Sequence, residues 1–163
     1  MQSLLPILLT LSVLLPTATL ADRPGDNRAI AGMETGRIMW DITIGDPQHL
    51  IGRLAVIEQT FDDMVRQGLK PEMVLGFRGG AAGLIAASPD HRDDREAFVL
   101  RQVHERLQGL LQRDSVHMEA CGLATQRFDL AQEDLLPGIH LVGNTFLSIM
   151  GYENQGYSTI RLD

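Results

Sequence analysis

Cys121 is the single cysteine of this 163-residue sequence, and it follows a strand-like segment, Ser115–Ala120. Gly122 and a helical pattern come directly after it. Backbone N–H groups at the start of a helix carry partial positive charge and favour a thiolate over a thiol. We therefore predict a nucleophilic Cys121, provided that its sulfur is accessible and largely ionised at neutral pH. The alternative interpretation is a packed cysteine, because free cysteine is among the most buried residue types.

The chemistry open to such a thiolate falls into a few classes. A thiolate can attack a sulfur donor and carry sulfur, or it can be oxidised to sulfenic acid in peroxide sensing. An intramolecular disulfide needs a second cysteine, and this sequence has none. Any redox or transfer cycle must therefore be completed by another molecule or subunit.

The elements that position Cys121 follow from the hydrophobic pattern. Short segments rich in β-branched and aromatic residues alternate with helical segments, which predicts an α/β fold with about five mostly parallel strands and helices on both faces, in three layers. The expected strands are Arg37–Ile44, Met73–Phe77, Ser115–Ala120, Ile139–Val142 and Tyr157–Leu162, and the expected helices span residues 49–68, 81–87, 90–111, 122–130 and 144–154.

The carboxyl ends of parallel strands are where ligands bind in open α/β sheets. Three segments are expected to meet there, Arg78-Gly79-Gly80, Cys121-Gly122 and Gly143-Asn144. Arg78 or Arg127 could stabilise the thiolate or bind an anionic sulfur compound, although most arginines lie on the surface. Cys121 is the candidate catalytic residue, and the candidate substrate-binding residues are Arg78, Gly79, Gly122, Arg127 and Asn144.

The amino-terminal segment, residues 1–21, has the pattern of a secretory signal: an apolar run, Leu4–Leu15, precedes small residues that end at Ala21. An uncleaved membrane anchor is the alternative, but the run is short for a bilayer span. We predict a flexible segment at 22–36, a single domain at 37–163, and a periplasmic or secreted protein without membrane association after processing. The net charge of −7 argues against nucleic-acid partners.

Cofactor and metal sites are not predicted. The sequence contains neither a GxGxxG motif after the first strand nor a Walker loop. Its five histidines show no HxxxH or HxH spacing.

The carboxyl-terminal part, from Glu119 to Leu162, resembles DsrE/DsrF-like proteins of sulfur-relay type. The shared motifs are Ala120-Cys121-Gly122, Asp134-Leu135-Leu136-Pro137-Gly138 and Gln155-Gly156-Tyr157. The resemblance implies a three-layer α/β fold, homo-oligomers and a persulfide on Cys121. This chain departs from the family pattern in two ways. It has Arg78-Gly79 where similar proteins often have His-Gly, and it is predicted to be exported, whereas the better-known relay proteins work in the cytoplasm.

Two functions are therefore expected. The first is a sulfur-carrier or thiol-transfer protein of sulfur metabolism, acting on donor and acceptor proteins or small sulfane compounds through Cys121, as a relay partner or as an enzyme. The second is a non-catalytic small-molecule-binding or assembly module in which the cysteine is structural.

Overall fold

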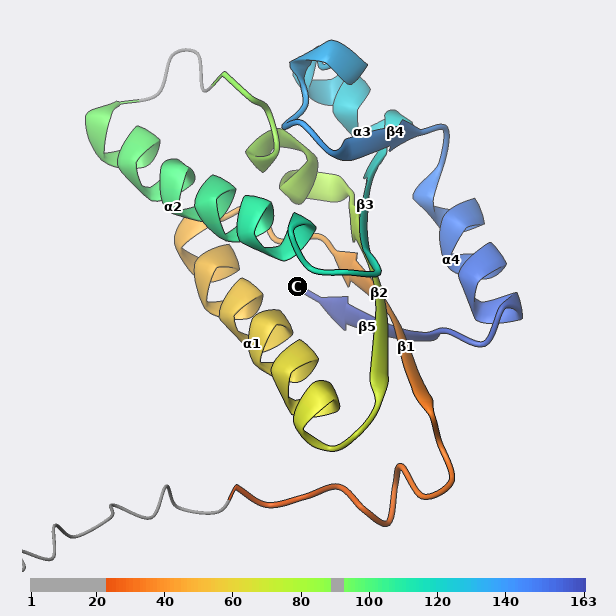
Figure 1. The fold of residues 1–163 in the computed structure, drawn as a ribbon. Coiled ribbons are helices and arrows are strands. Elements are labelled where there is room, and N and C mark those ends of the chain that lie inside the picture. Colours follow the sequence, from red (N-terminus) through yellow and green to blue (C-terminus); the bar gives the residue numbers. More distant parts are fainter. Residues whose placement is uncertain (1–22, 89–92) are drawn as a thin grey trace, which may run out of the picture.

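Five parallel strands form one sheet in the order β4-β3-β2-β1-β5 in the computed structural model, which describes residues 23–88 and 93–163 (Figure 1). All neighbouring strands run in the same direction. The α/β class and the parallel sheet are thus confirmed. The strands are β1 (Thr35–Ile42), β2 (Lys70–Phe77), β3 (Val116–Cys121), β4 (Ile139–Val142) and β5 (Ser158–Leu162).

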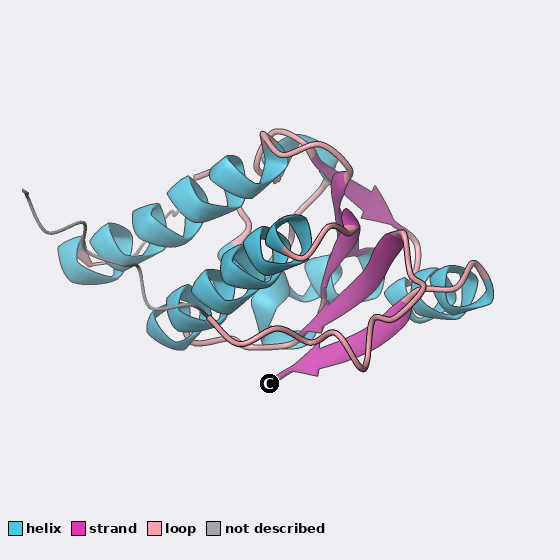
Figure 2. Ribbon diagram, turned by 60° about the horizontal axis from the view of Figure 1, so that its bottom comes forward, coloured by secondary structure: helices cyan, strands magenta, loops and turns pink. Residues whose placement is uncertain are grey.

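Helices cover both faces of this sheet, which confirms the three layers. The helices α1 (Pro47–Arg66) and α2 (Asp94–Leu111) lie together on one face, and α4 (Thr145–Asn154) lies on the other (Figures 1 and 2). Short helical segments follow the carboxyl ends of the strands. They are the helix α3 (Gly122–Thr125) and the 3₁₀-helices η1 (Gly79–Leu84), η2 (Gln126–Phe128) and η3 (Gln132–Asp134).

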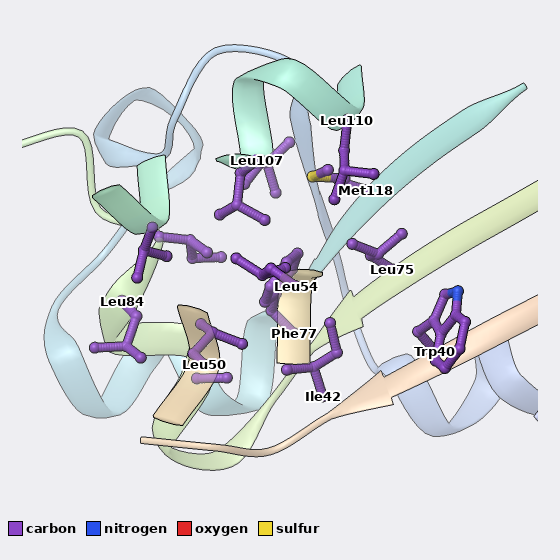
Figure 3. Close-up of a cluster of buried hydrophobic side chains, with 14 of the residues drawn as sticks. Trp40, Ile42, Leu50, Leu54, Leu75, Phe77, Leu84, Leu107, Leu110 and Met118 are labelled. Carbon is purple, nitrogen blue, oxygen red and sulfur yellow. The ribbon is translucent and has the colours of Figure 1, made fainter. Parts of the chain in front are cut away.

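The main core lies between the sheet and the α1/α2 pair (Figure 3). Side chains alternate along a strand, so every second residue of β1, β2 and β3 points into this core. Leucines from one side of each helix meet them, because three- and four-residue spacing gives α1 and α2 one apolar face. The fully buried members include Ile42, Leu75, Phe77, Met118, Leu50, Leu54, Leu107 and Leu110.

The other strand residues face α4 and form a more polar layer. Asp41 of β1 and both Glu119 and Cys121 of β3 belong to this set, since they alternate with the core residues of the same strands. The α4 residue Tyr152 donates a hydrogen bond to Glu119 across the layer. The two faces of the sheet therefore do different work: one holds the core, and the other holds groups that can do chemistry.

Two helices differ from the sequence expectation. The helix predicted at 122–130 stops early: α3 ends at Thr125, and η2 ends before Asp129, which adopts a left-handed backbone with φ of 52°. The helix predicted at 81–87 is the 3₁₀-helix η1, which begins at Gly79. The ring of Phe128 packs so closely on Gly83 that a Cβ there would lie 2.8 Å from it. We attribute both differences, the early end of the helix after Cys121 and the 3₁₀ conformation of η1, to tertiary packing.

Strand boundaries moved by a few residues. β1 begins at Thr35 and β2 at Lys70, so Pro71 lies inside a central strand. This is tolerated because β2 pairs there with β1 alone; its pairing with β3 begins at Met73. The segment before β1 is bonded to the end of α1, where Gln67 and Asp26 exchange two hydrogen bonds.

The predicted signal segment, residues 1–21, falls outside the described residues. Within the part of the chain that the structure describes, none of the helices combines the length and the apolar character that crossing a membrane requires.

Candidate functional site

Cys121 is the last residue of β3 and is buried, with 3% of its surface exposed. The expected access to solvent is therefore absent in the folded chain. The residue does not belong to the main core, however; it packs separately with Ala82 and Ala124, which come from η1 and α3. It thus lies beneath the loops at the carboxyl edge of the sheet, where the sequence predicted it.

Hydrogen-bond donors from α3 and α4 lie near enough to the Cys121 sulfur to influence its pKa. Burial alone raises the pKa of the thiol and is the largest single influence. The Thr145 hydroxyl and the backbone N–H groups of Thr145, Ala124 and Leu123 oppose it, and together they bring the net pKa below the ordinary value. Hydrogen bonds to the charged form are what favour it. The folded chain therefore favours the Cys121 thiolate more than solvent favours the thiolate of a free cysteine.

Thr145 is a site residue that the sequence pattern did not indicate. Its hydroxyl is buried and has no hydrogen-bond partner of standard geometry among the described residues, although it lies near enough to the sulfur to lower its pKa. The first turn of α4 reaches Cys121 because β4 pairs in register with β3, with Val142 opposite Cys121, and α4 begins shortly after. The residue before it, Asn144, was predicted as a binding residue, although asparagine at this position is typical of a helix start.

Arg78 lies beside Cys121, as predicted. Phe77 of β2 pairs with Ala120 of β3. The residues that follow them, Arg78 and Cys121, are therefore neighbours. Adjacent strands are about 4.8 Å apart. The negative charge of a Cys121 thiolate is one of the influences that raise the pKa of Arg78, after the larger effect of its hydrogen bonds to a carboxylate.

That carboxylate is Asp41, a residue that the sequence analysis did not select. Arg78 Nε and Nη2 donate to the two Asp41 oxygens, each at 2.6 Å. The Phe146 ring of α4 lies over the guanidinium, 4.8 Å from its carbon to the ring centroid. The arginine is thus held from two sides, by a bidentate ion pair and a cation–π contact.

The two predicted glycines are required by the backbone around the site. Gly79 has a φ of +56°, a left-handed conformation that favours glycine. At Gly122 a Cβ would lie 2.9 Å from the carbonyl oxygen of Val142. Gly122 therefore allows β3 and the β4–α4 loop to approach closely, which brings Thr145 to the sulfur.

The remaining candidates have other roles. The Asn144 side chain accepts a hydrogen bond from the Phe146 N–H at 3.0 Å and caps α4, so it positions the helix. Arg127 is exposed on η2 and makes no ion pair within residues 23–88 and 93–163. The structure thus brings Arg78, but not Arg127, together with Cys121.

A second polar pair, Glu119 and Tyr152, lies on the same face of the sheet. The Tyr152 hydroxyl donates to Glu119 Oε1 at 2.8 Å, and Glu119 Oε2 is buried without a partner among the described residues. Burial, followed by the bond to Glu119, raises the pKa of Tyr152 to about 12. The pair ties α4 to β3 next to the cysteine.

Metal binding finds no support in the described part of the chain, where no three His, Cys, Asp or Glu side chains are grouped to hold an ion. An apolar groove of about 500 Å³ lies elsewhere, near the amino ends of β1 and β5. Its lining includes Ile30, Met33, Ile38, Met64, Leu69 and Ile160.

Thr145→Val is expected to raise the pKa of Cys121, because it removes one of the donors that favour the thiolate. The midpoint of the pH profile for Cys121 alkylation measures this. The control is Thr159→Val, since the Thr159 hydroxyl is also buried and finds no partner in the described part of the chain, but lies on the edge strand β5. Equal midpoints in the two variants would exclude a role for the Thr145 hydroxyl.

Comparisons with known proteins bear on the fold alone. No family model matches the sequence, and no curated protein matches it. Among solved structures, the chain is similar to the protein of unknown function MTH1491 from Methanobacterium thermoautotrophicum, with a TM-score of 0.61 and 13% sequence identity. The match covers 78% of this chain and 99% of that one. At this identity the likeness supports the α/β architecture.

Proposed function

We propose that this protein is a sulfur carrier of DsrE/DsrF-like type in which Cys121 bears the transferred sulfur as a persulfide. The observation that carries the proposal is the set of donors around the sulfur, which lowers the pKa of a buried thiol. Desolvation without such donors would keep the sulfur protonated and inert. A thiol that only fills space has no need of them.

The chemistry requires a thiolate and an approach to it. The Cys121 thiolate attacks a sulfane sulfur, and the persulfide later passes its outer sulfur to an acceptor. Because only 3% of Cys121 is exposed, transfer requires a local displacement of η1, α3 or the first turn of α4, the elements that supply its contacts. These are short segments and a helix end, which open at lower cost than the core.

Exposed apolar side chains near the site favour action within an assembly. Leu123 of α3 and Phe146, Leu147 and Met150 of α4 are each more than half exposed. Apolar clusters on a surface often mark contacts with other proteins. We therefore include a homo-oligomer, or a complex with a sulfur donor or acceptor protein, in the proposal.

Export to the periplasm or to the exterior is also part of the proposal, on the pattern of residues 1–21. Its test is whether the protein purified from its native source begins at Asp22. An intact Met1 would contradict it.

The second candidate is a non-catalytic module that binds a small molecule or assembles with other chains. The burial of Cys121 and the apolar groove of about 500 Å³ near β5 favour it. In this alternative the ligand occupies the groove and the cysteine serves only packing.

The deciding experiment is the intact mass of the protein after incubation with thiosulfate or polysulfide. The carrier proposal predicts a gain of one or more sulfur atoms, lost on treatment with a reductant and absent in Cys121→Ser. Cys121→Ala is a second variant without the thiol, and comparison of both variants with the wild type shows whether their folding is preserved. An unchanged wild-type mass with both donors, together with very slow alkylation, would favour the module.

A further inference from the structure

We propose that Arg78 binds the anionic end of the sulfur donor, so that the substrates are sulfane compounds with a sulfonate end, thiosulfate and thiosulfonate anions. This rests on the proposed sulfur-carrier function. The juxtaposition that carries it is Arg78 beside Cys121 on one face of the sheet, with the first turn of α4 over both.

The guanidinium is fixed in place and still has donors to offer. Arginine has five N–H donors, and Asp41 takes two of them, from Nε and Nη2. The others have no partner among the described residues. The two hydrogen bonds to Asp41 hold the group in place, so little conformational entropy is lost when an anion binds. A sulfonate presents oxygens to such a fork much as a carboxylate does.

An independent observation at the sulfur points the same way. Thr145 is 1% exposed, and its hydroxyl has no partner of standard geometry although it lies at Cys121. A buried donor without an acceptor is costly unless a group that uses it is sometimes present. The terminal sulfur of a persulfide is an anion that extends beyond the Cys121 sulfur and can accept a hydrogen bond from the Thr145 hydroxyl. The site therefore has hydrogen-bond donors for both ends of the sulfur compound, Arg78 for the sulfonate and Thr145 for the transferred sulfur.

The transfer balances without another reactant. The Cys121 thiolate attacks the outer sulfur of thiosulfate, and a sulfur–sulfur bond forms between them. The sulfur–sulfur bond of thiosulfate breaks, and its electron pair leaves with sulfite. The thiolate becomes a persulfide anion, so total charge is conserved and no proton moves. Arg78 would bind the oxygens that become those of sulfite, whose negative charge it stabilises as the bond breaks.

Phe146 marks the approach to Arg78. Its ring lies over the guanidinium, yet 57% of the residue is exposed. Exposed side chains change rotamer within nanoseconds. Rotation of this ring uncovers Arg78 without disturbing the core, so the anion reaches the guanidinium first and the sulfur when the first turn of α4 moves.

The test compares two methanethiosulfonate reagents whose ethyl chains carry opposite charges, the sulfonatoethyl anion and the trimethylammonioethyl cation. Each modifies a thiolate with loss of methanesulfinate, so neither depends on sulfur carriage. For Cys121, the rate constant of the anionic reagent is divided by that of the cationic reagent. This ratio, divided by the same ratio for N-acetylcysteine amide, reports charge preference independently of thiol access. We expect Arg78→Gln to lower this ratio about tenfold. Arg127→Gln, which removes an exposed arginine, should change it less than about twofold.

An unchanged ratio in Arg78→Gln would overturn the inference, even if the wild type forms a persulfide. Conversely, a lowered ratio without persulfide formation from thiosulfate or polysulfide would support anion binding by Arg78 and contradict the carrier function. The double variant Asp41→Asn/Arg78→Gln keeps a hydrogen-bonded pair, and it serves if Arg78→Gln alone does not fold. Arg78→Lys should keep the charge preference but slow transfer from thiosulfate, because a lysine loses the bidentate geometry.

Discussion

Asp41→Ala should lower the free energy of unfolding by about 3–5 kcal/mol, the cost of leaving one member of a buried ion pair without its partner. The Arg78 and Asp41 side chains are 18% and 8% exposed. Without the carboxylate, the guanidinium keeps its charge in a poorly solvated position and loses two hydrogen bonds. Urea unfolding followed by circular dichroism measures the change.

The control is an exposed ion pair between β1 and β2. Arg37 of β1 and Glu72 of β2 form an ion pair whose side chains are 42% and 24% exposed. Glu72→Ala should cost at most about 1 kcal/mol, because solvent screens the pair and replaces its hydrogen bonds. Equal losses in the two variants would show that Asp41 does not hold a desolvated charge.

Tyr152→Phe should remove a loss of stability that the wild type shows in alkaline solution. The pKa of Tyr152 is raised from 10.0 to about 12, first by burial and then by its hydrogen bond to Glu119. A pKa raised by folding contributes stability that is fully present at pH values below the pKa of the group in the unfolded state. This stability declines as the pH rises through the pKa of the group in the folded state. The window is therefore pH 10–12, where the wild type should lose about 2–3 kcal/mol through this group.

The measurement is the free energy of unfolding of both proteins at several pH values up to 12. In Tyr152→Phe the decline across this window should be smaller by that amount. At neutral pH the variant should be less stable by about 1.5–3 kcal/mol, because Glu119 loses a charge-assisted hydrogen bond. Tyr157, whose pKa is also raised by burial, keeps its own share of the decline in both proteins. Parallel curves would exclude the Tyr152 assignment.

The elements around the site were predictable to different degrees. The segment 139–142 was predicted as a strand with its observed bounds, and β3 and β5 were predicted to within one residue at each end. Alternating apolar residues and glycine or proline stops are local signals, and they survive in the folded chain. The helix after Cys121 was predicted too long because Asp129 and the packing of Phe128 on Gly83 are not visible in a helical pattern.

The residue pattern was sufficient to predict the parallel α/β fold and the meeting of Arg78, Gly122 and Asn144 at the carboxyl edge, because alternation of strands and helices leaves few other topologies. Three features of the site became visible in the folded chain alone: the burial of Cys121, the position of Thr145 near its sulfur and the ion pair of Asp41 with Arg78. These contacts join different strands and helices, and they depend on strand order and register. Strand order and register arise from packing of the whole chain, so no local pattern of residues specifies them.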